Sequence, residues 1–235
     1  AYARVGIDRP WRHHVLAAEA AHRCEHVVVA TGTASGKSLA YQLPALTDAL
    51  IARGHRGERG ASTLYVAPTK ALAQDQLASL AALGLGVRLA AHDGDSSREE
   101  REWTREHGEY VLTNPDMLHH SLLPGHARWA QFLGSLRYVV IDECHHYRGV
   151  FGAHVAHVMR RLRRVCAEWG AHPTFVLTSA TIAAPEETAS RLTGLDVAAF
   201  TQDDSPRGRT SLLLWEPPLT DHVGENGAPV RRAAS

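Results

Sequence analysis

The stretch Val27-Val28-Val29-Ala30-Thr31-Gly32-Thr33-Ala34-Ser35-Gly36-Lys37-Ser38 decides the fold of this chain. A β-branched run is followed at once by a glycine-containing turn, which leads into a helix-length amphipathic segment over 37–53. Such a turn directs consecutive backbone N–H groups and the positive end of a helix dipole toward an anion. The lysine adds a positive charge for phosphate oxygens, and the serine hydroxyl can bind Mg²⁺. The stretch therefore predicts a nucleotide phosphate loop formed by Thr31, Gly32, Thr33, Ala34, Ser35, Gly36, Lys37 and Ser38.

The loop departs from the usual pattern at one position. The pattern begins with a glycine, but this chain has Thr31 there, and Gly32 follows one place late. Because backbone groups make most of the phosphate contacts in such loops, we expect this difference to matter little. An ordinary Gly-Ser turn with a solvated lysine is the alternative, but it does not explain why one of only two lysines, Lys37, lies here.

The pattern of an apolar run followed by polar residues occurs five times along the chain. Continuous aliphatic runs are typical of strands buried on both faces, and strands that alternate with helices predict an α/β fold with a mainly parallel sheet flanked by helices on both faces. The polar residues should then gather at the carboxyl edge of the sheet, where ligands bind in such folds. The predicted strands cover 27–30, 64–67, 110–113, 138–141 and 174–177, and the predicted helices cover 37–53, 70–83, 97–106, 115–133 and 150–169.

An acidic pair follows the fourth predicted strand, where Ile141 leads directly into Asp142 and Glu143. An aspartate at the end of a buried strand can hold Mg²⁺ through water, and the adjacent glutamate can orient or deprotonate an attacking water. Alone, such a pair is more often a loop-capping feature. Combined with the phosphate loop, it predicts a nucleotide-hydrolysing site in which Lys37, Asp142 and Glu143 are the catalytic residues.

The alternation of strands and helices ends near residue 203. We therefore expect one nucleotide-binding domain over residues 1–203, followed by an exit strand and a linker over 204–235. The exit strand is predicted over 211–215, before the two prolines at 217 and 218. Three glycines and alternating charges over 54–62 predict an exposed loop.

The composition is that of a globular chain with no marked charge. The 235 residues include 25 basic and 25 acidic side chains, and a hydrophobic content of 44% argues against a disordered chain. None of the cysteines, Cys24, Cys144 and Cys166, forms a Cys-x-x-Cys pair, which excludes a disulfide framework and a four-cysteine zinc site. With no apolar stretch near about 20 residues and no signal-peptide pattern, we expect a cytoplasmic protein without a membrane partner. Because the first residue is Ala1, we expect a fragment.

Several motifs resemble those of the first RecA-like domain of superfamily-two DEAD/DEAH-box helicases, in family order over residues 10–182. Motif I is the phosphate loop at 31–38, motif Ia resembles 67–76, motif Ib resembles 113–116, motif II is the Asp-Glu-Cys-His sequence at 142–145, and motif III lies at 179–181. Within the superfamily, the segments 28–38, 92–95 and 147–152 look most similar to bacterial mitomycin-repair helicases and their fungal RecQ-four-like relatives. The resemblance implies a RecA-like P-loop NTPase fold, with ATP and Mg²⁺ as cofactors held in part by Ser38 and Asp142.

The resemblance also implies a nucleic-acid partner, single-stranded or partly duplex, with DNA favoured over RNA. It assigns coupling between hydrolysis and strand binding to His145, Ser179, Ala180 and Thr181. Contacts to a sugar-phosphate backbone do not read bases, so we expect sequence-independent binding that weakens with salt. The implied backbone-binding residues are Pro68, Thr69, Lys70, Asp93, Gly94, Asp95, Thr113, Asn114, Pro115 and Asp116.

The chain differs from the family pattern upstream of motif I and at its end. The family has a glutamine that reads adenine where this chain has His14, and one imidazole cannot reproduce that paired hydrogen bond. We therefore expect a relaxed preference for ATP over GTP. The family's second RecA-like domain, which carries an arginine finger, is not in this sequence. We therefore expect residues 1–235 alone to bind nucleotide weakly and to have little hydrolytic or unwinding activity.

Alternatives remain open at this point. An RNA helicase of the DEAD-box kind and a P-loop ATPase acting on a protein partner share the same motor motifs. A zinc site around Cys144, His145, His146, His154 and His157 is disfavoured, because motif II already explains His145. We expect Trp103 and Trp129 to pack against the sheet rather than stack on bases, and the arginines at 160, 161, 163 and 164 to form a solvated helix face.

Overall fold

The computed structural model describes residues 1–53, 60–206, 208, 211, 213–216, 219–223 and 229–231. Within these ranges the chain divides into two compact units, Ala1–Ser205 and Pro206–Ser235. The larger unit contains every motif identified in the sequence, and the smaller unit contains an antiparallel pair of strands, β8 (Leu219–Val223) and β9 (Pro229–Arg231). Among the described residues, no helix is both long enough and apolar enough to span a bilayer.

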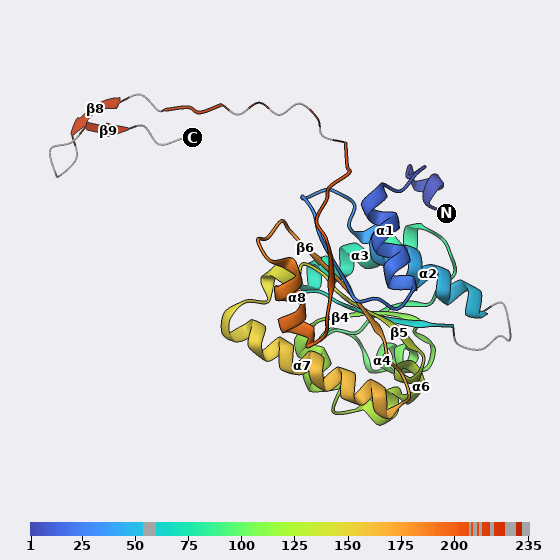
Figure 1. The fold of residues 1–235 in the computed structure, drawn as a ribbon. Coiled ribbons are helices and arrows are strands. Elements are labelled where there is room, and N and C mark those ends of the chain that lie inside the picture. The colour runs from blue at the N-terminus through green and yellow to red at the C-terminus, as the bar shows by residue number, and fades with distance from the viewer. Residues whose placement is uncertain are drawn as a thin grey trace. The chain divides into compact units, whose positions relative to one another are not determined.

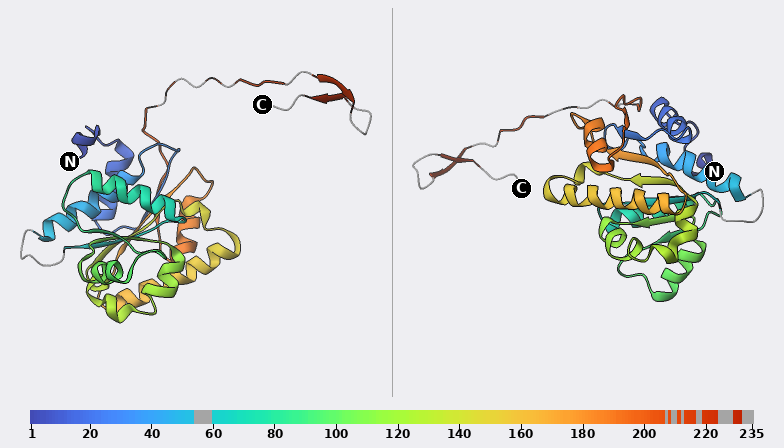
Figure 2. Two further views of the ribbon diagram at one scale, coloured as in Figure 1. Left: turned by 180° about the vertical axis from the view of Figure 1, so that it is seen from behind. Right: turned by 60° about the horizontal axis from the view of Figure 1, so that its bottom comes forward.

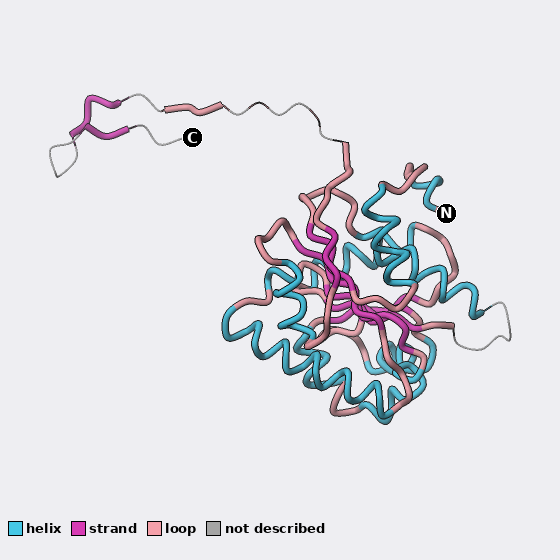
Figure 3. The backbone as a smooth tube through the Cα atoms, viewed as in Figure 1, coloured by secondary structure: helices cyan, strands magenta, loops and turns pink. Residues whose placement is uncertain are grey.

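The larger unit is built on a seven-stranded sheet in which every pair of neighbouring strands is parallel. The order is β3-β4-β2-β5-β6-β1-β7, and Figure 3 shows these strands together at the centre of the unit. The five predicted strands are therefore confirmed, with two short strands added at the sheet edges. The strands are β1 (Val27–Ala30), β2 (Ser62–Val66), β3 (Leu89–Ala91), β4 (Tyr110–Thr113), β5 (Leu136–Ile141), β6 (Thr174–Ser179) and β7 (Ala198–Phe200).

Helices cover both faces of this sheet, as predicted (Figure 1). One apolar cluster joins the sheet to α1 (Arg12–His22), α2 (Ser38–Arg53) and α3 (Lys70–Ala82), through buried side chains that include Tyr41, Tyr65 and Leu80. A second cluster joins the other face to α6 (Ala130–Gly134), α7 (Gly149–Glu168) and α8 (Pro185–Thr193). Figure 2 shows the long α7 lying across its face of the sheet. Helix α4 (Arg98–His107) begins with a capping box between Ser97 and Glu100.

The prediction of one continuous helix over 115–133 is wrong. The segment forms four short pieces: α5 (Pro115–Met117), a π-helix η2 (Leu118–Leu122), a 3₁₀-helix η3 (His126–Trp129) and α6. Pro124 and Gly125 separate η2 from η3, because proline lacks the N–H that a continuing helix needs and glycine weakens helix formation. Trp129 is buried against the sheet, as predicted, whereas Trp103 is 44% exposed on α4, which contradicts its predicted burial.

Two further predictions need correction. Ser211 and Leu213–Trp215 form no strand, and the strands of the smaller unit lie further along, at β8 and β9. The predicted loop over 54–62 lies mostly outside the described residues, and Ser62 already belongs to β2.

A close backbone contact fixes the start of α7. A Cβ atom added at Gly152 would lie 2.4 Å from the Tyr147 carbonyl oxygen, and backbone cannot move aside as a flexible side chain can. We expect Gly152→Ala to lower the free energy of unfolding by about 1 to 3 kcal/mol, measured by urea denaturation. Gly134→Ala is the matched control, because its nearest neighbour is at 3.4 Å. Equal effects of the two substitutions would contradict this explanation.

Candidate active site

The predicted phosphate loop joins the end of β1 to the start of α2. Positive φ angles at Ala34 and Gly36 turn the backbone so that the amides of Gly36, Lys37 and Ser38 lead into the helix. Within the described ranges no protein acceptor pairs with these three amides. Lys37 Nζ lies over the loop and donates to the carbonyl oxygens of Thr31 at 3.3 Å and Gly32 at 2.9 Å. Free amides at a helix N-terminus beside an ammonium group fit the phosphates of a nucleotide.

The side chain of Thr31 explains why this position tolerates a residue other than glycine. Thr31 Oγ1 and Ser35 Oγ are 2.6 Å apart, and Ser35 Oγ donates to the Gly32 carbonyl at 2.7 Å. Both hydroxyls are buried and hold the two sides of the loop together. The Thr31 side chain therefore stabilises the loop through its contact with Ser35, and it does not face a phosphate.

His14 is packed beneath the loop and uses both ring nitrogens. Its Nδ1 accepts a hydrogen bond from the Trp11 amide at 3.2 Å, so Nε2 carries the proton and donates to the Ser35 carbonyl at 2.8 Å. The ring is 1% exposed and stacks on Trp11. Burial lowers the pKa of His14 below its ordinary value, although the bond to Ser35 opposes that shift. His14 supports the loop, and no nitrogen remains to read a base.

This arrangement sharpens the expectation of relaxed nucleotide selectivity. Because His14 has no free donor or acceptor for adenine, we expect kcat/KM values for ATP and GTP within about tenfold of each other. A His14→Gln variant should raise the ATP:GTP ratio, since an amide offers both a donor and an acceptor. Turnover assays with each nucleotide test both statements. Strong selectivity for ATP in the unsubstituted protein would contradict them.

The acidic pair lies two strands from the phosphate loop on the same edge. Strand register places Ala30 beside Ser179 and Leu177 beside Ile141, so motifs I, III and II end three adjacent strands. The Asp142 carboxylate accepts hydrogen bonds from the Tyr65 and Thr178 hydroxyls. Burial and the nearby Asp142 charge raise the pKa of Tyr65, which keeps its hydroxyl protonated as a donor. Each carboxylate oxygen retains a lone pair, so the donor set fits a Mg²⁺ ion held through water.

Glu143 and His145 connect motif II to motif III. Glu143 adopts a left-handed conformation with φ 47°, and its amide donates to Thr178 Oγ1 at 3.1 Å. His145 Nδ1 accepts from the Ala180 amide at 3.2 Å and lies 3.1 Å from Glu143 Oε2. Burial lowers the pKa of His145, although the Glu143 carboxylate opposes this. A single imidazole therefore touches both the candidate base and the motif III backbone.

The remaining residues of motifs II and III differ in exposure. Cys144 is fully buried in the core, and burial raises the pKa of its thiol to about 12, so this cysteine fills space rather than acting as a nucleophile. Ser179 is buried at the end of β6, while Ala180 is half-buried and Thr181 is exposed.

Motif Ia and the segment after β3 meet at a cavity of about 680 Å³. Lys70, at the start of α3, forms ion pairs with Asp95 and, at 3.7 Å, with Asp93. Burial would raise the pKa of Asp93, but the Asp95 amide, Lys70 and Ser96 together lower it below its ordinary value. Thr69 caps α3 by accepting from the Leu72 amide. The structure thus brings Lys70 together with Asp93 and Asp95, which lie more than 20 residues further along the chain.

The residues of motif Ib differ in their exposure and in their hydrogen bonds. Thr113 is buried and donates to the His92 carbonyl at 2.8 Å, and Pro115 is buried as well. The Asn114 side chain caps α5 by accepting from the Met117 amide at 2.9 Å. Among these four residues, Asp116 is the exposed one. Thr113 and Asn114 therefore shape the turn.

Of the other candidate strand-binding residues, Pro68 is half-buried and Gly94 is exposed.

Among the residues that the structure describes, no group of three or more His, Cys, Asp or Glu side chains is arranged to hold a metal ion.

Sequence reasoning did not identify several residues that support the site. Tyr65 and Thr178 lie inside strands, where their apolar neighbours gave no sign of a polar role. His13 Nε2 lies 3.1 Å from the Ser35 carbonyl oxygen, and Asp203 lies beside the loop, where an added Cβ at Gly32 would be 3.0 Å from its carboxylate. Two adjacent histidines at 13 and 14 were the sequence feature that could have indicated this support, because both contact the Ser35 carbonyl under the loop.

Adjacent strand ends that carry a phosphate loop, an acidic pair and a Ser-Ala-Thr turn define a P-loop NTPase domain of RecA-like fold. The chain belongs to the DEAD/DEAH box helicase family, whose model matches residues 12–189. This finding confirms the resemblance read from the motifs.

Similar proteins agree with this assignment. The chain is 41% identical to the uncharacterized ATP-dependent helicase YprA of Bacillus subtilis, over 94% of this chain and 29% of YprA. It is 40% identical to the ATP-dependent helicase HRQ1 of Saccharomyces cerevisiae, over 89% of this chain and 20% of HRQ1. A crystal structure of the DUF1998 helicase MrfA bound to DNA and AMPPNP matches with a TM-score of 0.88 and 40% identity, over 98% of this chain and 31% of that chain. The chain therefore spans less than a third of the length of these relatives.

Proposed function

We propose that this chain is the first motor domain of an ATP-dependent helicase or translocase that moves along DNA and acts in repair. One observation carries the proposal: motifs I, II and III end adjacent strands β1, β5 and β6, and the candidate strand-binding residues lie at the same edge of the sheet, after β2, β3 and β4. Nucleotide and nucleic acid would therefore contact one continuous edge. In this scheme, residues 1–203 form the motor domain, and 204–235 lead toward a second RecA-like domain.

The hydrolytic step follows from the geometry of the edge. The amides of Gly36 and Lys37, with the Lys37 ammonium, bind the phosphates and stabilise the charge that develops on them. Ser38 and Asp142 would hold Mg²⁺, which supplies further charge neutralisation at the phosphates. Glu143 orients the attacking water and accepts its proton. His145 transmits the state of this site to motif III through its contact with the Ala180 amide.

DNA is favoured over RNA because of the relatives. MrfA has been crystallised with DNA and AMPPNP. The present chain is 40% identical to MrfA, and the match covers 98% of this chain. Backbone contacts from Lys70 and the start of α5 are not specific for either sugar, so the motor motifs alone do not decide between the two. The repair role rests on the resemblance to the mitomycin-repair helicases.

The test is ATP turnover by the full-length protein without a strand, with single-stranded DNA, and with RNA of the same sequence. We expect DNA to stimulate turnover more than RNA. Equal or greater stimulation by RNA would move the protein to the RNA-remodelling class, and no stimulation by either strand would favour a protein partner. Glu143→Gln protein supplies the background rate.

A further inference from the structure

One face of α7 carries a regular series of aromatic and basic side chains. Phe151, His154, His157, Arg161 and Arg164 follow one another at intervals of three or four residues, so they lie along one face of the helix. Phe151 is 48% exposed, and both His154 and His157 are exposed. Arg164 is exposed as well, and Arg161 is half-buried. This face of the helix is therefore accessible to a partner outside the domain.

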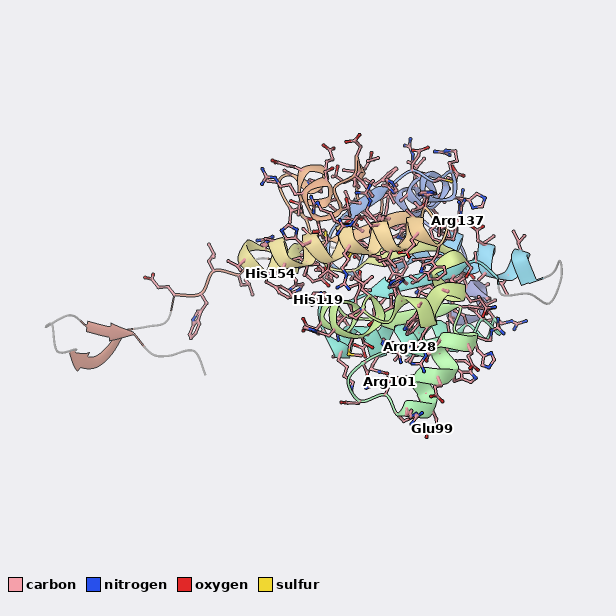
Figure 4. All side chains as sticks on the ribbon, turned by 90° about the horizontal axis from the view of Figure 1, so that it is seen from below. Glu99, Arg101, His119, Arg128, Arg137 and His154 are labelled. Atoms are coloured by element: carbon pink, nitrogen blue, oxygen red, sulfur yellow. The ribbon has the colours of Figure 1, made fainter. Side chains whose placement is uncertain are left out.

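This face forms one wall of a groove of about 570 Å³. The other wall comes from α5 and η2, which contribute Asp116, His119 and His120. Figure 4 labels His119 and His154, which come from the two walls. Three arginines and one carboxylate line the groove, which gives it a formal charge of +2 with histidines neutral, in a chain whose net charge is zero. The groove therefore favours an anion, and its histidine N–H groups are further donors.

The arginines of α7 divide into two kinds. Arg160 donates to the Ala156 carbonyl and to carbonyls at the end of α8, and Arg163 donates to the Thr193 and Gly194 carbonyls. These two guanidinium groups cap α8 and are held in place. Arg161 and Arg164, in contrast, have no hydrogen bond or ion pair within the part of the chain that the structure describes. Their positive charges are available to a ligand.

We propose that this groove binds the phosphodiester backbone of single-stranded nucleic acid, as a continuation of the strand bound at motif Ib. The inference rests on the proposed function, because the groove begins at Asp116, in motif Ib itself. From there it extends along α7 to Arg164, away from the nucleotide site. The strand contacts of this domain thus extend beyond the motifs that define its family.

The chemistry of the groove suits a single strand. Basic side chains that track a backbone, together with an exposed aromatic ring on which a base stacks, are the usual combination at sites for single strands. Phe151 supplies the ring at the mouth, and Arg161 and Arg164 supply the charges further along. Thirteen helical steps separate Phe151 from Arg164, a length of ~20 Å, which is long enough for several nucleotides of a single strand.

The experiment measures binding of full-length protein to fluorescent oligo-dT of about 8 and about 20 nucleotides across a range of salt. We expect Arg161→Ala/Arg164→Ala to leave the short strand unaffected and to weaken the long strand about tenfold, with a salt slope shallower by roughly 1.4. Arg4→Ala/Arg23→Ala removes two exposed arginines from the far face and serves as the matched control. Arg161→Lys/Arg164→Lys should retain most of the affinity, and thermal unfolding checks that each variant is folded.

The outcomes separate the groove from the function on which it rests. If the unsubstituted protein binds neither strand, both proposals fail. In a second case the unsubstituted protein binds both strands, and the Arg161→Ala/Arg164→Ala variant shows the same increase in affinity from the short to the long strand. Only the proposal that the groove binds the strand is then overturned. The same variants are tested on a duplex with a short single-stranded tail, and a loss confined to that probe would overturn the assignment to a single strand and point to duplex binding. Their oligomeric state is measured by size-exclusion chromatography, and a shift without loss of DNA affinity would instead make the groove an interface between copies.

Discussion

Glu143→Gln in the full-length protein is expected to leave ATP binding intact and to slow DNA-stimulated turnover by about 10²- to 10⁴-fold. The glutamine keeps the size of the side chain and one acceptor oxygen, but it cannot accept a proton from the attacking water. The left-handed backbone at Glu143 and the bond from its amide to Thr178 fix where this carboxylate lies. The substitution changes neither feature, so its effect should fall on chemistry alone.

The measurement is phosphate release at saturating ATP, together with nucleotide affinity measured by fluorescence. Glu168→Gln, an exposed glutamate at the end of α7, is the matched control and should hydrolyse ATP at the unsubstituted rate. A Glu143→Gln protein with ordinary turnover would overturn the assigned mechanism, whereas loss of nucleotide binding would mean that Glu143 has a structural role.

The parts of the fold that the sequence predicted are those with strong local signals. Each of the five predicted strands is a continuous apolar run, and such runs are distinctive of buried parallel strands. Helix α1 carried no such signal, because its buried apolar residues are small alanines such as Ala17 and Ala20. The edge strands β3 and β7 are only three residues each and are partly exposed. Their pairing depends on neighbours distant in sequence, which no local pattern records.

The sequence predicted those parts of the candidate site that lie within one short segment. It did not predict the contacts that depend on how the strands are paired. Residues 31–38 and 142–145 form their loops locally, so their spacing is informative. The contacts of Tyr65 and Thr178 with Asp142 exist only because β2, β5 and β6 are neighbours in a fixed register. Likewise, His14 fits the position of a base-reading glutamine by sequence, yet its packing under Ser35 gives it a different task.

A second large effect is expected on the rate of ATP hydrolysis when residues 1–235 are separated from the rest of the protein. Residues 1–235 alone should hydrolyse ATP at least about 10³-fold more slowly than the DNA-stimulated full-length protein. The resemblance to the family implies a second RecA-like domain that supplies an arginine finger, and such a residue contributes roughly 10³- to 10⁵-fold to the rate. The loop amides and Lys37 remain in residues 1–235 and are expected to stabilise part of the charge that develops on the phosphates, but they do not replace an arginine finger.

The comparison is phosphate release by the two proteins at equal concentration, with circular dichroism to verify that residues 1–235 are folded. Ala1–Ser205 forms a compact unit with its own two-sided core, so we expect the isolated chain to fold. Nucleotide affinity should fall far less than the rate, because the amides and the lysine remain. Comparable turnover by the isolated chain would mean that a basic group within residues 1–235 stabilises the transition state. The proposed second domain would then be needed for movement along the strand rather than for hydrolysis.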